Sequence, residues 1–268
     1  MKRIMSIVTA ISLVAALCVG PAYAVDVTPR TVGDLTFGSE VSQADIDALT
    51  PAQLAVLEKE AIGPVVGLYT VEGGTGASDV APFASSEQIP ASDMSITFGV
   101  TQDATTSSIV SFRVVAMATW KTTRSYNFRD YIGLTWDPFF TLNENTHEAY
   151  TYYNKNGDTG FSNTDGSDND SKCRLANGDG NNGLSYAVLL TQYDQMVVIA
   201  ATLSESSASG RDGTSMFWAA CAYMHCFKEI QVSGVTLSVS ASPSFDVSMS
   251  LVDKVAQRSG YYSKRYES

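Results

Sequence analysis

Histidine is scarce in this chain, and the short motifs that nominate common catalytic centres are missing. The only histidines are His147 and His225. The sequence contains no Gly-x-Ser-x-Gly nucleophile elbow, no His-Glu-x-x-His metal-binding helix and no P-loop. It therefore favours a non-enzymatic protein. A hydrolase whose catalytic acids are scattered along the sequence is an alternative.

Basic residues are also few. Lys and Arg number 17 against 28 Asp and Glu, and Lys2 and Arg3 are the only charged residues among the first 24. The chain from residue 25 onward therefore carries a formal net charge of −13. An acidic surface repels phosphates at long range, so nucleic acids are excluded as natural partners and anionic membrane surfaces are poor ones.

Long apolar runs are absent beyond the start of the chain. Residues 4–20 are mostly apolar, follow two basic residues and precede a proline and the small-x-small triplet at 22–24. This is the pattern of a signal peptide, so we expect cleavage between Ala24 and Val25 and secretion of the mature chain. No later run is long enough to cross a bilayer as a helix.

Cysteine is sparse and odd in number after the leader. The three mature cysteines are Cys173, Cys221 and Cys226. Export permits disulfides, but on one strand Cys221 and Cys226 would point to opposite faces and could not pair with each other. The sequence predicts a disulfide from Cys173 to one of them. A zinc site formed by these cysteines and His225 is the weaker alternative, because no Cys-x-x-Cys pair is present.

The first part of the mature chain predicts a short helical hairpin. Ser42 can cap a helix over 43–49, and Thr50 with Pro51 supplies the cap and first turn of a second helix ending near residue 61. We assign this helical segment and its extended lead-in to residues 25–71. Whether they form a separate unit or a pro-segment stays open at this point.

Glycine, serine, alanine and proline dominate residues 72–92, which predicts a linker or a long surface loop. Residues 93–253 then carry β-branched and aromatic runs separated by polar turns, at 108–120, 132–136, 147–153, 184–191, 196–203 and 215–232. Strands at this spacing predict a mainly β fold, an antiparallel β-sandwich preceded by the helical hairpin. Residues 254–268 are assigned to a C-terminal tail.

Residues 235–251 alternate strictly between apolar residues at odd positions and mostly serine at even positions. This parity favours a hairpin with a three-residue loop at 242–244, which pairs Val239 with Val247 and leaves one apolar and one polar face. A soluble sandwich would bury the apolar face. A membrane-active, pore-forming-like protein that inserts this hairpin is the alternative.

Residues 154–183 contain twelve Asn or Asp and six Gly. Alternating side-chain oxygens on a glycine-rich backbone suit a calcium ion, so this segment is a candidate calcium loop. The same residues also serve a solvated loop in which Asn and Gly permit turns, and this second interpretation is favoured because the spacing fails the EF-hand pattern. The candidate ligands are Asn154, Asn156, Asp158, Asp168, Asp170 and Asp179.

Aromatic residues recur along the predicted β-domain, and most of them suit a sandwich core. Tyr150, Tyr152 and Tyr153 form a candidate binding platform, since exposed aromatic rings can stack on the apolar faces of sugars. Taken together, these features favour a secreted, acidic, non-enzymatic β-sandwich with a binding or surface-interaction role. The sequence nominates no firm cofactor or metal, and its extracellular partner stays unidentified.

Overall fold

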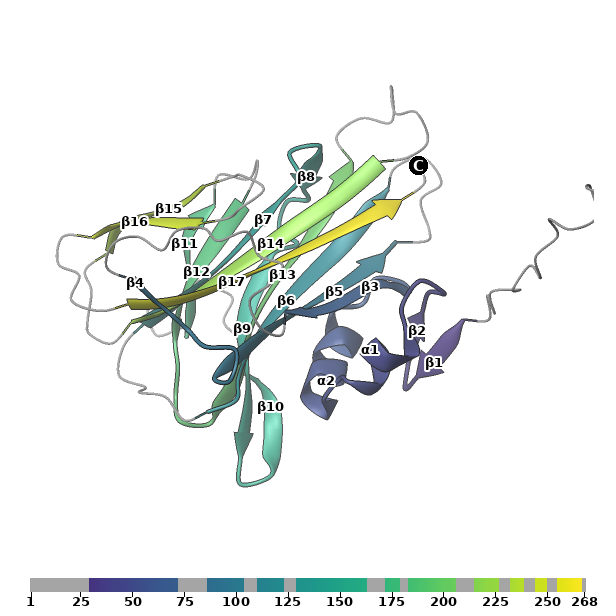
Figure 1. Ribbon diagram of the computed structural model, residues 1–268, viewed down its shortest axis with the longest axis horizontal. Coiled ribbons are helices and arrows are strands. Elements are labelled where there is room, and N and C mark those ends of the chain that lie inside the picture. Colours follow the sequence, from purple (N-terminus) through teal and green to yellow (C-terminus); the bar gives the residue numbers. More distant parts are fainter. Residues whose placement is uncertain are drawn as a thin grey trace, which may run out of the picture.

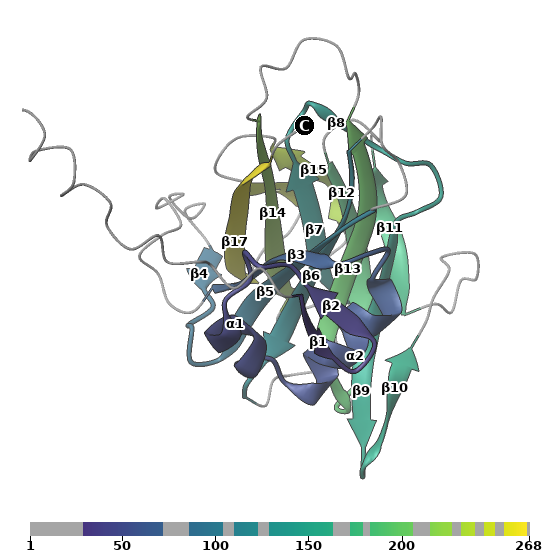
Figure 2. The ribbon, with the colours of Figure 1, turned by 90° about the vertical axis from the view of Figure 1, so that its right-hand side faces the viewer.

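The computed structural model describes residues 29–71, 86–103, 110–122, 129–162, 172–178, 183–205, 215–226, 232–238, 244–249 and 255–266. Two stacked β-sheets form the body of the protein, as Figures 1 and 2 show. The predicted mainly β sandwich is therefore confirmed. The predicted signal peptide at 1–24 lies outside the described residues, so export stays a prediction.

The larger sheet has nine strands. Along the sheet they follow the order β1 (Arg30–Val32), β2 (Leu35–Phe37), β3 (Val65–Val71), β5 (Met94–Gln102), β6 (Ser111–Trp120), β13 (Asp194–Glu205), β9 (Glu148–Lys155) and β10 (Asp158–Ser162), and β8 (Phe140–Leu142) also pairs with β13. The N-terminal segment thus shares a sheet with strands from the middle of the chain.

The smaller sheet has six strands. Their order is β11 (Cys173–Gly178), β12 (Gly183–Leu189), β7 (Arg129–Trp136), β14 (Ser215–Cys226), β17 (Val255–Tyr266) and β4 (Ser86–Gln88). Pairing is antiparallel in both sheets except between β2 and β3 and between β17 and β4, which are parallel. β14 lies between β7 and β17, so both of its edges are hydrogen-bonded.

Period-two alternation places one face of each strand in the core between the sheets. On β6 the even-numbered residues from Phe112 to Ala118 belong to this core, and Val110 and Trp120 pack against it. Ile132, Leu134 and Trp136 on β7 follow the same rule. Burial thus selects one parity of each strand, as the period of two in an extended chain requires.

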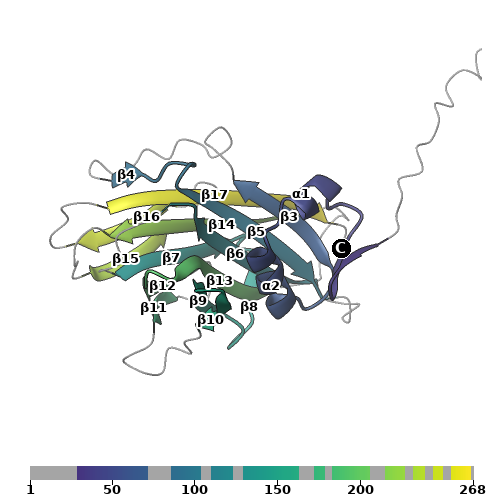
Figure 3. The same cartoon turned by 90° about the horizontal axis from the view of Figure 1, so that it is seen from below.

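The two short helices cover the outer face of the larger sheet (Figure 3). The first is α1 (Gln43–Asp47), in which Ser42 accepts the N–H of Asp45, and the second is α2 (Pro51–Glu60), which begins with a capping box between Thr50 and Gln53. Both N-caps agree with the sequence-based prediction.

A second hydrophobic core forms between these helices and the sheet. It joins Val56 and Leu57 of α2 to Val115 and Met117 on the odd-numbered face of β6. The Cδ2 atom of Leu57 would lie 2.2 Å from a Cβ atom at Gly99, so only glycine on β5 permits this close approach. The helical segment is thus packed as part of the same fold as the sandwich.

The serine-patterned hairpin differs from the prediction in register. The strands β15 (Val232–Ser238) and β16 (Ser244–Met249) pair Leu237 with Phe245 and Val235 with Val247. Odd residues still face odd residues, as predicted, but the segment between the strands spans residues 239–243 instead of three residues. Together β15 and β16 form a separate two-stranded sheet, with β15 beside β11 and β12.

The structure assigns the C-terminal residues differently from the sequence analysis. The predicted tail contains β17, which pairs with β14 from Val255 to Tyr266. Tyr262 packs into the core between the sheets, and its hydroxyl would lie 1.9 Å from a Cβ atom at Gly67 on β3. This strand is rich in polar residues, so the sequence pattern did not predict it. The predicted linker at 72–92 likewise contains the short strand β4.

Candidate functional site

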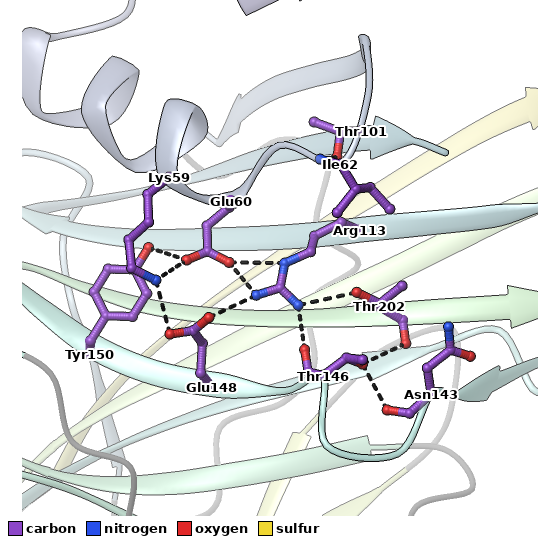
Figure 4. Close-up of polar contacts among 10 residues, drawn as sticks. All are labelled: Lys59, Glu60, Ile62, Thr101, Arg113, Asn143, Thr146, Glu148, Tyr150 and Thr202. Carbon is purple, nitrogen blue, oxygen red and sulfur yellow. Dashed lines mark hydrogen bonds and ion pairs between the residues drawn. The ribbon is translucent and has the colours of Figure 1, made fainter. Parts of the chain in front are cut away.

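A buried group of charged side chains lies where α2 meets the larger sheet (Figure 4). Glu60 is the last residue of α2, Arg113 lies on β6 and Glu148 begins β9. Glu60 and Arg113 are only 3% and 7% exposed. With Lys59 and Tyr150, these residues form what we call the α2 charge cluster.

Arg113 connects four segments through its guanidinium group. Its Nε donates to Glu60 Oε2 at 2.9 Å, and its Nη2 donates to the same oxygen and to Glu148 Oε1, the latter at 3.0 Å. Its Nη1 donates to Thr202 Oγ1 at 3.2 Å and to the carbonyl oxygen of Thr146. A planar group with five N–H donors suits this arrangement better than a lysine would.

Lys59 and Tyr150 complete the cluster on its other side. Lys59 Nζ lies 2.5 Å from Glu60 Oε1 and 2.9 Å from Glu148 Oε2, and it sits 4.1 Å from the centre of the Tyr150 ring. The Tyr150 hydroxyl donates to Glu60 Oε1 at 2.8 Å. Two cations therefore face two carboxylates, and both Glu60 oxygens accept hydrogen bonds.

The electrostatics of the cluster keep Glu60 ionised. Burial acts to raise the pKa of Glu60, but the positive charge of Arg113 and the hydrogen bonds from Lys59 and Tyr150 outweigh it and hold this pKa below its ordinary value. Burial and the negative charge of Glu60 raise the pKa of Tyr150 far above its ordinary value. Glu60 thus lacks the raised pKa of a general acid, and the cluster acts as a clamp between α2 and the sheet.

A second buried polar group lies between the two sheets. Asp130 on β7 accepts hydrogen bonds from the hydroxyl of Tyr223 and, at 3.1 Å, from the backbone N–H of Cys226. The Nδ1 atom of His225 lies 2.9 Å from Asp130 Oδ1, and the Trp120 ring meets the His225 ring edge-on at 5.3 Å. His225 and Asp130 are buried, so this histidine is a strand residue paired with a carboxylate.

His147, the other histidine, lies beside the α2 charge cluster. Its Nδ1 is 2.6 Å from the hydroxyl of Tyr186. Burial, assisted by the positive charge of Arg113, lowers the pKa of His147. The two histidines therefore lie in different places, one between the sheets and one near Arg113, and do not form a common site.

Asp194 at the start of β13 is a third buried carboxylate with full hydrogen bonding. It accepts from Thr151 Oγ1 at 2.7 Å, from Lys172 Nζ at 2.9 Å and from the backbone N–H of Thr191 at 2.6 Å. Burial acts to raise its pKa, but these bonds hold the pKa below its ordinary value. The arrangement fixes the turn before β13.

The candidate calcium ligands that the structure describes form a tight turn. Asn156 and Gly157 both have positive φ, at 57° and 91°, between β9 and β10, and Asn154 Oδ1 accepts the N–H of Gly157 at 3.0 Å. This is the backbone geometry of a two-residue hairpin loop, for which Asn-Gly is the favoured pair. Asp158 begins β10 in this hairpin. Asp168, Asp170 and Asp179 lie outside the described residues, so their part of the prediction is untested.

The candidate tyrosine platform is not an exposed surface. Tyr150 and Tyr152 belong to the core beneath the helices, where both meet Phe161 edge-on. Only Tyr153, which has the opposite parity, is half-buried, and it packs against Gly160 across the hairpin. The prediction is wrong for Tyr150 and Tyr152, because the helices cover a sheet face that sequence parity left open.

The predicted disulfide is not formed. Cys173, Cys221 and Cys226 are all buried, and no disulfide joins any two of them. Cys173 lies on β11, which β12 and β7 separate from β14. Three strand spacings amount to about 14 Å, whereas a disulfide requires Cα atoms within about 7 Å. Burial, with the charge of Asp130, raises the pKa of Cys226 to about 12.

An aromatic patch that the sequence analysis did not identify lies on the outer face of the smaller sheet. The Trp218 and Tyr261 rings, from β14 and β17, stack at a centroid distance of 6.1 Å and an angle of 25°. Both residues are half-buried, whereas Phe139 on the turn between β7 and β8 is 65% exposed. We call these three residues the aromatic patch. The sequence signal was the parity of Trp218, which is opposite to that of the core residues Phe217 and Ala219.

Asp137 connects the members of the aromatic patch. Its backbone N–H donates to the carbonyl oxygen of Trp218 at 3.0 Å, and its Oδ1 accepts the N–H of Phe139 at 3.0 Å. Burial raises the pKa of Tyr261, and the negative charge of Asp137 adds to this rise. Figure 1 shows the start of β14 and the end of β17, where these residues lie, near the C-terminus and β8.

Within the described ranges, no three His, Cys, Asp or Glu side chains are grouped so that they could hold a metal ion. The zinc alternative therefore gains no support from Cys173, Cys221, Cys226 and His225. Among the same residues, no helix has both the length and the apolar character that a bilayer span requires.

The fold is a β-sandwich with helices over one sheet. Comparisons with known proteins find solved structures that resemble it only weakly. No family model and no curated protein matches the sequence. A collagen-binding subdomain of the Enterococcus faecalis surface protein ACE matches 64% of this chain and 96% of its own, with 9% identity and a TM-score of 0.36.

Two further solved structures give similar values. The collagen-binding domain of a Staphylococcus aureus adhesin matches 60% of this chain and 95% of its own, with 6% identity and a TM-score of 0.32. The pilus 2b backbone protein of group B streptococcus matches 63% and 83%, with 11% identity and a TM-score of 0.31. At these values the comparisons assign no family, ligand or activity to this chain.

Proposed function

We propose that the mature chain is a secreted, non-enzymatic β-sandwich that acts by binding an extracellular ligand or surface partner. The observation that carries this proposal is the aromatic patch of Phe139, Trp218 and Tyr261. A ring as exposed as Phe139 adds little to the stability of the fold, whereas Trp and Tyr are the side chains most often found at the centres of binding surfaces.

Export and charge limit the class of partner. The N-terminal pattern with its cleavage site between Ala24 and Val25 supports secretion. The excess of acidic over basic residues disfavours nucleic acids and anionic surfaces. The proposed partner is therefore extracellular and either neutral or basic.

The buried carboxylates do not support the hydrolase alternative. Glu60, Asp130 and Asp194 each accept several hydrogen bonds, and the pKa values of Glu60 and Asp194 are lowered. A general acid needs a raised pKa, and a nucleophile or base needs a free lone pair directed at the substrate. These three groups therefore suit structural roles.

The membrane-active alternative is disfavoured by length. The strands β15 and β16 comprise 7 and 6 residues, whereas a strand that crosses a bilayer needs about 9–11. Its test is dye release from liposomes, in which we expect no leakage.

A microarray that carries glycans, extracellular proteins and lipids tests the proposed function. The full mature chain is applied beside Trp218→Ala and beside Tyr69→Ala, which removes an exposed tyrosine from the larger sheet. We expect saturable binding that Trp218→Ala weakens and Tyr69→Ala leaves unchanged. Absence of saturable binding, or equal binding by both variants, would contradict the proposal.

A further inference from the structure

We infer that the aromatic patch is a binding site for neutral carbohydrate. This inference rests on the proposed binding function and names the chemical class of the ligand. It starts from the Trp218 and Tyr261 rings, which lie within 25° of parallel on neighbouring strands of one sheet face. Stacked rings that are only half-buried leave accessible aromatic surface at this position.

Such a surface matches the face of a sugar ring. The C–H bonds on the flatter face of a pyranose carry partial positive charge, and aromatic rings present a negative face to them. Because β14 and β17 are fully paired along this region, the two rings are held by the sheet and lose little freedom on binding. Phe139 is 65% exposed and lies on the adjacent turn, which Asp137 joins to the Trp218 backbone.

Polar groups at the border of the patch suit sugar hydroxyls. Ser263 is exposed and hydrogen-bonds with the side chain of Tyr261. Hydroxyl groups both donate and accept, so this pair can exchange hydrogen bonds with a polyhydroxylated ligand. Binding sites that combine an apolar surface with a few polar groups fix a ligand's orientation in this way.

Charge complementarity separates neutral from acidic carbohydrates. The backbone N–H of Asp137 donates to the carbonyl oxygen of Trp218, and the negative charge of Asp137 helps to raise the pKa of Tyr261. The chain as a whole has a net charge of −11. A sulfated or carboxylated polysaccharide would be repelled by both the local and the overall charge, whereas a neutral one would not.

The test uses the full mature chain and polysaccharides of known composition. Cellulose, chitin and xylan serve as insoluble neutral probes, and their soluble oligosaccharides are titrated while tryptophan fluorescence is recorded. Heparin is the acidic counterpart. Trp136 is fully buried and Trp120 is half-buried against the core between the sheets, so a change in emission on titration is assigned to Trp218 only if it is lost when the titration is repeated with Trp218→Phe.

Five variants make the test specific. Trp218→Ala and Tyr261→Ala should each weaken binding about tenfold or more, Trp218→Phe should retain part of it, and Tyr69→Ala should have no effect. Phe139→Ala changes a side chain that is 65% exposed, so it keeps the fold intact and should still weaken binding.

The outcomes distinguish this inference from the proposed function. Retention on a neutral polysaccharide that depends on Phe139 and Trp218 supports both. Array binding to a protein or lipid alone, with no retention on the neutral polysaccharides, overturns the carbohydrate inference and leaves the binding function in place. Binding to heparin in preference to the neutral probes, or neutral binding that the patch variants do not weaken, also overturns the inference.

Discussion

At the scale of single residues, burial and pairing decide the behaviour of this protein's charged groups. Glu60 occupies the last position of α2, where the helix dipole disfavours a negative charge. Arg113 and Lys59 offset this cost and also neutralise Glu148. The energetic importance of such a cluster appears when one partner is removed, because an unpaired charge then remains buried.

Arg113→Ala should therefore destabilise the fold by about 3–5 kcal/mol. The substitution leaves Glu60 in its buried position without its main cationic partner. Urea unfolding of the two proteins measures the change. Lys59→Met is the matched control, since this cation is partly exposed and should contribute about 1 kcal/mol or less. Equal effects of the two substitutions would contradict the assigned role of Arg113.

Stability should also fall on acidification. The pKa of Glu60 is lower in the folded protein than its ordinary value of 4.5, so the unfolded chain binds a proton more readily. The contribution of Glu60 is therefore present above this value and is lost as the pH falls through the folded-state pKa. Asp194 acts in the same direction. Thermal melting across the acidic range should show a decline that is shallower in Glu60→Gln. A decline of the same slope in the variant would rule out Glu60 as a contributor.

At the scale of elements, the helical segment and the larger sheet are joined by close packing. Leu57 of α2 reaches the backbone of β5 only because residue 99 is glycine. The face that α2 covers includes Val115, Met117 and Met196. These apolar residues would be exposed to water if the helices were removed, so the helices belong to the stable fold.

Gly99→Ala should destabilise the protein by about 1–3 kcal/mol, because the added methyl group overlaps Leu57 in a filled core. Leu57→Ala should cost about 2–5 kcal/mol through the cavity that it leaves. The double variant should cost less than the sum, since the new methyl group occupies the vacated space. Additive free energies of unfolding would show that the two residues do not contact each other.

Removal of residues 25–62 should prevent cooperative folding of the remainder. The truncation exposes the second hydrophobic core and leaves Arg113 without Glu60. Circular dichroism melting and size-exclusion chromatography of the truncated chain provide the measurement. A soluble monomer with an unchanged melting transition would instead indicate that this segment is a removable pro-segment.

At the scale of the whole molecule, the sandwich is held together without a disulfide among Cys173, Cys221 and Cys226. The sheets are instead joined by the core between them and by Arg258 of β17, which donates to the carbonyl oxygens of Ile89 and Val71. Val71 belongs to the larger sheet, so this arginine connects the two layers.

Reduction should consequently leave the melting temperature unchanged. A disulfide that closes a loop of about 50 residues would contribute on the order of 4 kcal/mol, which is readily seen in a thermal scan. The experiment compares melting with and without a reducing agent. A clear fall in the melting temperature after reduction would show that a disulfide does stabilise the protein.

The sequence by itself determined the mainly β class, the inward faces of β6 and β7 and the caps of both helices, since each depends on neighbouring residues and a local period. It also correctly paired odd with odd residues in the serine-patterned hairpin.

Tertiary structure alone decided which faces the helices cover, and this buried Tyr150 and Tyr152 while leaving Trp218 and Tyr261 half-exposed. It also placed β11 three strands from β14, which separates the cysteines, and it brought Glu60, Arg113 and Glu148 together. The contacts of Arg113 with Glu148 and Glu60 join residues 35 and 53 positions apart, and no local period in a single sequence encodes a pairing at such a distance.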